Sequence, residues 1–173
     1  MATLFRILIV FIRTLIRKES FDLLSETSLG FTSLPLEMDF NGHMNNGSYL
    51  KMMDLARSDH AFKIKNLARV SRKYGWKSVV GSVEINYLRS ISLFQFYDIY
   101  TQISHWDERW IYIKQKFVRQ EKIMAIALVK TVVISKTQGR ISPQEVFREL
   151  GYDIPSPPAM PLFSGDLKKL ENL

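Results

Sequence analysis

The sequence predicts an α+β fold in which an antiparallel sheet of about five strands wraps around one long helix. First, apolar residues recur at steps of three and four through residues 49–67, which is typical of an amphipathic helix. Second, four strand-like runs with short connections follow within residues 79–134. Short connections favour antiparallel neighbours, because parallel neighbours need crossovers of a dozen or more residues. A chain of 173 residues with 46% hydrophobic composition can bury one core of this kind.

The composition excludes several classes of site. There is no cysteine, which rules out disulfides, thiolate zinc sites and cysteine nucleophiles and fits a reducing compartment such as the cytoplasm. The three histidines lack an HExxH-like spacing, so we expect no metal. There is also no GxSxG elbow and no glycine-rich phosphate loop. Four of the seven net positive charges precede the first acid, and the remainder is too small to indicate nucleic-acid binding.

Residues 1–18 form an amphipathic segment before the predicted domain. Residues 4–16 are apolar apart from Arg6 and Arg13, and they are fewer than the ~20 residues that a bilayer-spanning helix needs. No small-residue cleavage site of a secretory signal follows. On a helix, Arg6, Arg13 and Arg17 share one stripe beside a broad apolar face. The pattern predicts either a helix lying peripherally on an anionic membrane surface or a helix packed on its own domain or on a partner subunit.

The predicted domain, residues 25–150, starts with an extended segment over residues 26–38, where Pro35 indicates an edge or irregular position. The long helix begins at Asn45 or Asn46, either of which can cap the first N–H groups, and runs to about Leu67. A polar connector, Ala68 to Gly75, follows. The apolar stripe of the helix consists of Tyr49, Met52, Met53, Ala56, His60, Ile64 and Leu67.

The strand-like runs predict a meander. The first places Val79, Val83, Ile85 and Tyr87 on one face. The next two, roughly residues 94–106 and 110–118, mix aromatic, β-branched and polar residues as half-buried strands do. The fourth, residues 123–134, is apolar on both faces near its centre. After the strands, the capping-box spacing of Ser142 with Glu145 and the stop at Gly151 predict a short helix. The prolines of residues 151–173 indicate an irregular tail.

The richest chemistry lies in residues 39–50, which lead into the long helix. Asp39, Gly42 and His43 stand within five residues, just upstream of a helix N-terminus. Free N–H groups and the helix dipole favour developing negative charge there, and a carboxylate facing polarising amides can attack a carbonyl. The alternative is a polar loop in which Asp39 and Asn45 are capping residues, which is the commoner use of such residues.

The pattern Asp39-x-x-Gly42-His43-x-Asn45-Asn46-x-x-Tyr49-Leu50, followed by Asp54-Leu55-Ala56-Arg57, resembles the signature of hotdog-fold acyl-CoA thioesterases of the 4-hydroxybenzoyl-CoA thioesterase-like group. Residues 85–89 and 106–110 resemble a branch related to thioesterase superfamily member six. The resemblance spans roughly residues 25–150. It implies a hotdog fold, hydrolysis of an acyl-CoA thioester without metal or redox cofactor, and a homodimer or dimer of dimers with sites built across an interface.

The resemblance also implies roles for individual residues. Asp39 would attack the thioester carbonyl or activate a water, and the N–H of Asn46 would polarise the thioester oxygen. His43 would orient the thioester or bind water, with a structural role as its alternative. The candidates for substrate contact are Gly42, Asn45, Arg57 and Arg89, and Gly42 also supplies a turn that a β-carbon would disfavour.

Asp54 is a rival catalytic carboxylate. A second hotdog lineage places its acid on the helix about eight residues beyond the polarising amide, and Asp54 has that spacing from Asn46. Its structural alternative is an ion pair with Arg57 or Lys51 on the helix surface.

Two further sets of side chains bear on the site. Glu37 can share a strand face with Asp39 and raise the pKa of Asp39 by repulsion. Arg89, Lys114 and Lys116 are candidates for contacts with the phosphates of CoA, although most exposed basic side chains are only solvated.

Two other functions fit the same residues. Some hotdog proteins pair an aspartate with a nearby histidine for enoyl-CoA hydration, although Asp39 and His43 are one residue closer than that motif has. A non-catalytic acyl or lipid-binding module, held at a membrane by residues 1–18, would bind acyl-CoA without turnover.

Overall fold

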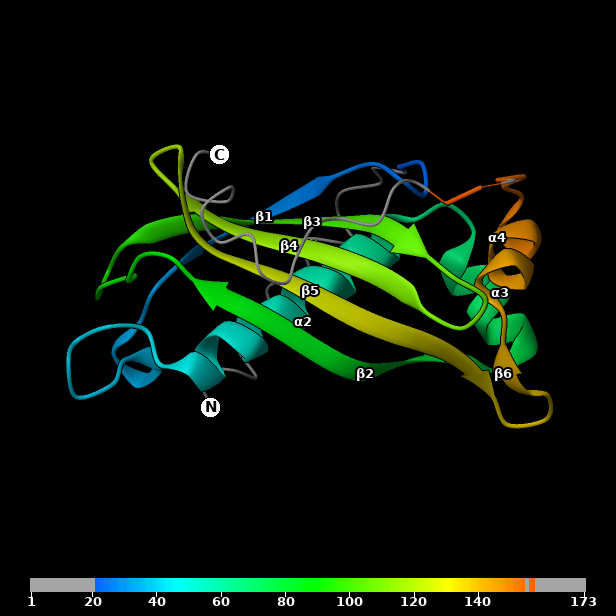
Figure 1. The fold of residues 1–173 in the computed structure, drawn as a ribbon, viewed down its shortest axis with the longest axis horizontal. Coiled ribbons are helices and arrows are strands. Elements are labelled where there is room, and N and C mark those ends of the chain that lie inside the picture. Colours follow the sequence, from blue (N-terminus) through cyan, green and yellow to red (C-terminus); the bar gives the residue numbers. More distant parts are fainter. Residues whose placement is uncertain (1–20, 155, 158–173) are drawn as a thin grey trace.

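Helix α2 (Asn46–Lys63) lies on the concave side of a curled, six-stranded antiparallel sheet (Figure 1). The computed structural model describes residues 21–154, 156 and 157. The strands are β1 (Thr27–Thr32), β2 (Trp76–Tyr87), β3 (Phe96–Trp106), β4 (Ile111–Arg119), β5 (Lys122–Ser135) and β6 (Gly139–Ile141). The other elements are η1, a 3-10 helix (Pro35–Glu37), and the helices α3 (Leu67–Tyr74) and α4 (Pro143–Leu150). The predicted α+β class, a sheet wrapped on one long helix, is confirmed.

The strand order is β1-β3-β4-β5-β2, with β6 beside the end of β5. The predicted meander is therefore right for β3, β4 and β5 but wrong for β2, which pairs with β5 from Trp76 opposite Ser135 to Tyr87 opposite Ala125. Residues 88–95 carry the chain across the molecule to β3, since a connection of this length does not force its two strands to be neighbours. In consequence β2 is an edge strand of the sheet.

The predicted apolar stripe of α2 is buried from Tyr49 to Ile64. It packs against inward residues of the sheet such as Phe117 and Val129, which are inaccessible to solvent. Full burial of one such side chain stabilises the fold by about 1.5–3 kcal/mol. A second apolar cluster joins the C-terminal end of α2 to α4, where the rings of Trp106 and Phe147 meet edge to face with centroids 4.9 Å apart. The two clusters fix α2 at both ends.

A bulge at Gly81 changes which residues of β2 share a face. Val80 pairs with Thr131, and Ser82 pairs with the adjacent Lys130, so Gly81 is an extra residue in the strand. A Cβ on Gly81 would lie 2.4 Å from the ring of Trp110, which covers this position. The prediction that Val79 shares a face with Val83 is wrong, because a strict two-residue repeat does not continue through a bulge.

Helix α2 ends earlier than predicted, at Lys63, because Ile64 is extended and Asn66 has a left-handed backbone (φ 66°). The segment predicted as a polar connector is mostly helix α3, so that prediction is wrong. Val70 is the buried residue of α3, and a single buried position gives little periodic signal. Gly75, with φ 65°, ends α3.

The local signals at both ends of the domain have different outcomes. Pro35 begins η1, so the extended segment predicted over residues 26–38 is interrupted by a 3-10 turn. The predicted short helix is confirmed as α4: Ser142 Oγ accepts from the N–H of Glu145 at 3.2 Å, and Gly151 ends the helix with φ 91°.

The segment 1–18 and most of the tail 151–173 lie outside the described residues. No helix in the described part has both the length and the apolar composition to cross a membrane.

Candidate active site

Residues 38–44 form a tight hairpin that leads into α2. Met38 and Met44 are bridged, Asp39 N–H donates to His43 O at 2.8 Å, and Gly42 N–H donates to Asp39 O at 3.1 Å. These bonds are those of a type I turn followed by a left-handed residue, here Gly42 with φ 72°. No described atom lies within 4 Å of a Cβ built on Gly42. The glycine therefore supplies backbone conformation, not space for a neighbour.

The carboxylate of Asp39 is held by this turn. Its Oδ1 accepts from the N–H groups of Asn41 at 2.8 Å and His43 at 3.2 Å, and the side chain is half-buried. Within the described residues, Oδ2 has no hydrogen-bond partner. Asp39 thus has a structural role in the turn and still presents one oxygen that can act on a substrate or a water.

The start of α2 follows directly. Asn45 is the N-cap, with its side chain accepting from Gly47 N–H at 2.8 Å, so the capping prediction is resolved in favour of Asn45 over Asn46. The N–H of Asn46 has no acceptor in the part of the chain that the structure describes. Asn46 is exposed, so this first helical N–H can receive an external oxygen.

Asp39 lies in the hairpin, whereas Asn46 lies beyond it as the first residue of α2. Asp39 lies opposite His43, and Asn46 is three positions after His43, about 10 Å for extended chain. The carboxylate also bonds to the amides of the turn and not to the start of α2. The two groups therefore belong to one region, and no hydrogen bond joins them in the part of the chain that the structure describes.

Two other polar side chains, those of His43 and Glu37, lie near Asp39 in the sequence. The side chain of His43 is exposed beside the turn. Glu37 belongs to η1, where its carboxylate accepts from the N–H of Leu34 at 2.9 Å, so it shares no strand face with Asp39 and that expectation is wrong.

The hairpin lies at the Tyr87 end of β2. Met44 N–H donates to the carbonyl of Ile91 at 2.8 Å, and His43 is bridged to Ser92. The rings of Tyr49 on α2 and Tyr87 on β2 have centroids 5.0 Å apart. Asp39, the start of α2 and the end of β2 thus form one corner of the molecule, at the left of Figure 1.

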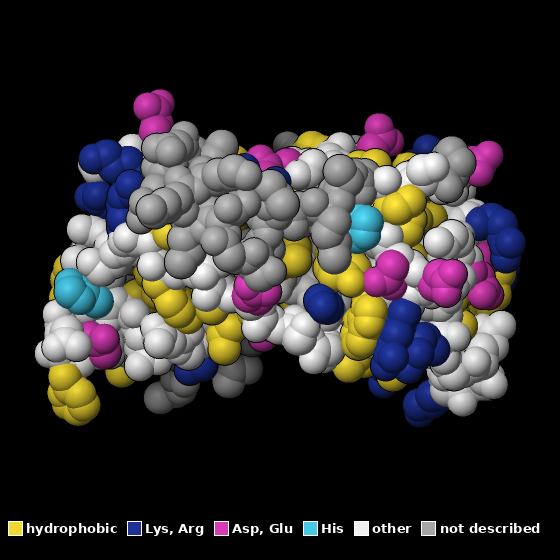
Figure 2. Space-filling view, in the orientation of Figure 1, with side chains coloured by type: hydrophobic (Ala, Val, Ile, Leu, Met, Phe, Trp, Pro, Cys, Tyr) yellow, Lys and Arg dark blue, Asp and Glu magenta, His cyan; other side chains and the backbone are white. Residues whose placement is uncertain are grey.

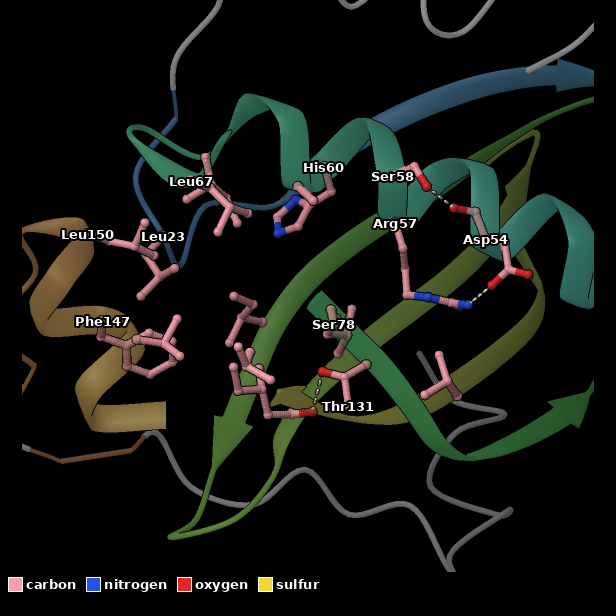
Figure 3. Close-up of a pocket in the computed structure, with 18 residues that line it drawn as sticks. Leu23, Asp54, Arg57, Ser58, His60, Leu67, Ser78, Thr131, Phe147 and Leu150 are labelled. Atoms are coloured by element: carbon pink, nitrogen blue, oxygen red, sulfur yellow. Dashed lines mark hydrogen bonds and ion pairs between the residues drawn. The ribbon is translucent and has the colours of Figure 1, made fainter. Parts of the chain in front are cut away.

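A cavity of about 320 Å³ lies near the other end of β2, between β2, the second half of α2, and α4 (Figure 3). Ser78 and Val80 line it from β2, and Phe147 lines it from α4. The rest of its apolar lining is Leu23, Ala61, Ile64, Leu67, Ile103, Ile111, Ile113, Val133, Val146 and Leu150. Asp39 and Asn46 do not line it, so the most chemically suggestive residues and the apolar space lie toward opposite ends of β2.

Asp54 and Arg57 border the cavity as a bonded pair. The two side chains are linked by an ion pair, as the structural alternative for Asp54 predicted. Arg57 also donates to Gln115 Oε1 at 2.6 Å. The side chain of Asp54 is 68% exposed and that of Arg57 only 11%, and burial lowers the pKa of Arg57 while Asp54 opposes that shift. Arg57 is thus committed to the protein interior and offers little to the phosphates of CoA.

His60 is the cavity residue that sequence reasoning missed. It lies in the apolar stripe of α2, and so it was counted with the core, yet its ring lines the cavity (Figure 3). Its Nδ1 lies 2.8 Å from Thr27 Oγ1, and burial lowers its pKa to about 4. A histidine inside an otherwise apolar stripe was the signal that could have identified it.

The basic candidates for CoA contact do not gather in one place. Arg89 is exposed near the Tyr87 end of β2 and donates to Ile123 O at 2.7 Å. Lys114 and Lys116 flank the inward Gln115 on β4, so they lie on the outer face, and Lys116 pairs with Glu26 at 2.9 Å. Of the three, Arg89 is the one beside the Asp39 hairpin. Among residues 21–154, 156 and 157, no cluster of three or more His, Asp or Glu side chains could hold a metal ion.

Comparison with known proteins identifies the family. The profile of the thioesterase-like superfamily matches residues 33–160. Over 131 residues the chain is 36% identical to Protein THEM6 of Danio rerio, covering 75% of this chain and 62% of that protein. It is 30% identical over 138 residues to the probable thioesterase YBR096W of Saccharomyces cerevisiae, covering 79% and 60%. The chain therefore spans about 60% of the length of these curated relatives.

The fold is also found among solved structures. The probable thioesterase YbaW of Escherichia coli superposes with a TM-score of 0.66 at 23% identity, covering 71% of this chain and 95% of that one. At this identity the likeness shows the fold. From its profile and its relatives, the chain belongs to the thioesterase-like superfamily.

Proposed function

We propose that the protein hydrolyses an acyl-CoA-type thioester to a carboxylic acid and a free thiol. The observation that carries the proposal is the arrangement along β2, whose outer edge is unpaired within the described residues. The Asp39 hairpin lies at one end of this strand and the apolar cavity at the other. Membership of the thioesterase-like superfamily supports the same reaction class.

The free edge of β2 supports a homodimer with shared sites. An isologous contact pairs two copies of β2 antiparallel, so the Tyr87 end of one strand meets the Ser78 end of the other. The Asp39 hairpin of one protomer then lies at the cavity of its partner. Hydrophobic side chains reach the surface at several points on the face of the molecule that Figure 2 shows. On the edge strand β2, Val79, Val80 and Val83 are each about 40% exposed. A dimer would cover them and complete two sites, alone or within a dimer of dimers.

In the proposed reaction Asp39 acts on the thioester carbonyl and the N–H of Asn46 polarises the carbonyl oxygen. Direct attack needs the carboxylate about 3–3.5 Å from the carbonyl carbon. A water between them extends the reach of the carboxylate by about 3 Å. Because Asp39 lies in the hairpin and Asn46 lies beyond it, we favour general-base activation of a water by Oδ2, with Oδ1 remaining in the turn. Exposed Arg89, at the same corner, is the candidate for a CoA phosphate.

One observation favours a second candidate, a non-catalytic acyl-binding module. The Asp39 carboxylate has a complete structural role in its turn, which an aspartate with no catalytic duty also performs. Such a module binds acyl-CoA without turnover, and membrane contact through residues 1–18 is part of this proposal.

Thiol release from a panel of acyl-CoA substrates separates the two candidates. Asp39→Asn is a sharp test because asparagine keeps the Oδ1 acceptor of the turn and replaces the basic Oδ2 by an uncharged NH2 group. We expect turnover to fall by about a hundredfold or more, as when a general base is removed. The matched control is Asp54→Asn, which breaks the ion pair with Arg57 and should leave most of the turnover. If folded Asp39→Asn keeps near-wild-type turnover and Asp54→Asn loses it, the catalytic role belongs to Asp54. If the wild-type chain releases no thiol from any substrate, the binding module is favoured.

A further inference from the structure

Helix α3 carries basic side chains on the side that faces solvent. Val70 is the buried residue of the helix. Arg69, Arg72 and Lys73 are exposed and line a hollow of about 410 Å³. Steps of three and four residues from Arg69 place Arg72 and Lys73 beside it on one face of the helix. Together with two exposed lysines that flank the helix, they form the α3 basic surface: Lys65, Arg69, Arg72, Lys73 and Lys77.

The charge of this surface is not balanced by acidic neighbours in the sequence. Residues 60–83 contain six lysines and arginines and neither Asp nor Glu. One of the six, Lys63, is buried and paired with Asp59 at 2.6 Å. Lys73 reaches Glu149 of α4 through a tyrosine hydroxyl that lies between them. Among the described residues, the other four basic side chains form no ion pair, so their charge is available to an external anion.

The arrangement is unfavourable for the helix on its own. Arg69 and Lys73 are four residues apart, a spacing at which like charges destabilise a helix. The hydroxyl of Tyr74 raises the pKa of Lys73, and the charge of Arg69 acts in the opposite direction. A helix of eight residues with one buried position gains little from packing to offset this repulsion. A short helix with a face of one charge sign therefore indicates a partner of the opposite sign.

The described chain begins beside this surface. Phe21 is bridged to Ile64, three residues before α3, and its N–H donates to Lys63 O at 3.0 Å. The segment that precedes Phe21 contains residues 1–18, whose pattern predicts contact with an anionic membrane surface. Stable attachment to a membrane takes two signals, such as an apolar anchor and a basic patch. The α3 basic surface is placed to supply the second signal.

We propose that the α3 basic surface binds the anionic phospholipids of a membrane, as a second contact beside residues 1–18. Screening by salt leaves the basic surface alone too weak for stable attachment, so the two contacts act together. Nucleic acid fits less well, because Tyr74 of α3 is half-buried and bonded to Glu149 and offers no open ring for a base to stack on. Helix α3 and the Asp39 hairpin lie at opposite ends of the molecule, so this contact leaves the hairpin free (Figure 1).

The test measures binding of the full chain to vesicles made of equal parts of phosphatidylcholine and phosphatidylserine. The variant combines Arg69→Gln, Arg72→Gln and Lys73→Gln, because glutamine removes each charge and is nearly as good a helix former. Each basic residue near an anionic surface contributes about fivefold to affinity, so the triple variant should bind about a hundredfold more weakly at low salt. On vesicles of phosphatidylcholine alone, the two proteins should bind equally.

A matched control changes the net charge by the same amount toward the other end of the molecule. It combines Lys51→Gln on α2 with Arg119→Gln and Lys122→Gln at the turn between β4 and β5, and it should keep most of the affinity. Circular dichroism confirms that both triple variants are folded. Equal losses in the two triple variants would show that net charge alone causes binding, and the proposal would be wrong.

Two other results would also overturn the proposal. One is a wild-type chain that does not bind the anionic vesicles. The other is an α3 variant that binds the vesicles as wild type does but loses affinity for free CoA or for a short RNA duplex, because the surface would then serve a different anion. The proposal holds for either function proposed above, and its failure leaves both intact, because no step of the test measures turnover.

Discussion

Replacing Gln115 by leucine tests whether a buried polar network holds Arg57 between α2 and the sheet. Gln115 is inaccessible to solvent. Its Oε1 accepts from Arg57 Nη1 at 2.6 Å, and its Nε2 donates to Met53 O at 3.1 Å and Thr101 Oγ1 at 3.0 Å. Leucine has a similar volume, so it leaves little cavity, but it removes all three bonds at once. It also leaves a guanidinium whose side chain is only 11% exposed without that acceptor.

The expected loss follows from these three bonds. A bond to a charged donor contributes about 1.5–3 kcal/mol to stability, and each neutral bond contributes about 0.5–1.5 kcal/mol. The added apolar contact of leucine offsets part of this sum. We therefore expect the free energy of unfolding to fall by about 3 kcal/mol. For a chain of this size the midpoint of thermal unfolding should fall by about 6–12 °C. Thermal unfolding followed by far-ultraviolet circular dichroism measures the shift.

The matched control is Gln102→Leu, on the neighbouring strand. Gln102 is half-buried and its Nε2 donates to Leu24 O at 2.9 Å, so this variant should cost about 1 kcal/mol, or about 2–4 °C. Equal shifts in the two variants would refute the idea that the Gln115 network is a particular source of stability.

Three other predictions concern assembly, pH and the membrane. Val83→Lys, near the middle of the free β2 edge, should convert a dimer seen by light scattering at micromolar concentration into monomer, and a monomeric wild type would contradict the shared edge. Burial lowers the pKa of His60 from 6.5 to about 4, so between these pH values the unfolded chain binds a proton that the folded chain does not. The free energy of unfolding should therefore fall by about 3 kcal/mol from pH 6.5 to pH 4. An equal fall in His60→Gln would show that another group causes the pH dependence. The full chain should sediment with anionic liposomes, and added salt should release only part of it, whereas a chain starting at Glu19 should stay in solution. If both chains stay in solution and the shorter one unfolds at a lower temperature, residues 1–18 belong to the fold.

The features that could be predicted from the sequence are those with local causes. The buried stripe of α2 follows from a 3.6-residue repeat, and the cap at Asn45 and the helix α4 follow from side chains within one turn of each helix end. Gly42 was expected to be conformational, and its left-handed backbone agrees.

The features that could not be predicted depend on tertiary contacts. Whether β2 lies beside β3 or β5 depends on which neighbour buries its inner face, and the bulge at Gly81 is coupled to the ring of Trp110, 29 residues later in the chain. Helix α3 buries little more than Val70. The cavity exists because of the position of the edge strand relative to α2, which is a tertiary feature. From the sequence alone, His60 is therefore predicted to be an ordinary core residue.

The central claim is that Asp39 of one protomer acts on a thioester whose acyl chain lies in the cavity of the other. Subunit mixing tests it directly. Asp39→Asn removes the carboxylate, and Ser78→Trp fills the cavity from its exposed side, so each variant alone should be nearly inactive in thiol release. After the two are unfolded and refolded together in equal amounts, half of the dimers are mixed and each mixed dimer carries one intact site, so about a quarter of wild-type turnover should return. Mixed dimers, verified by native mass spectrometry, that release no more thiol than the separate variants would contradict the claim.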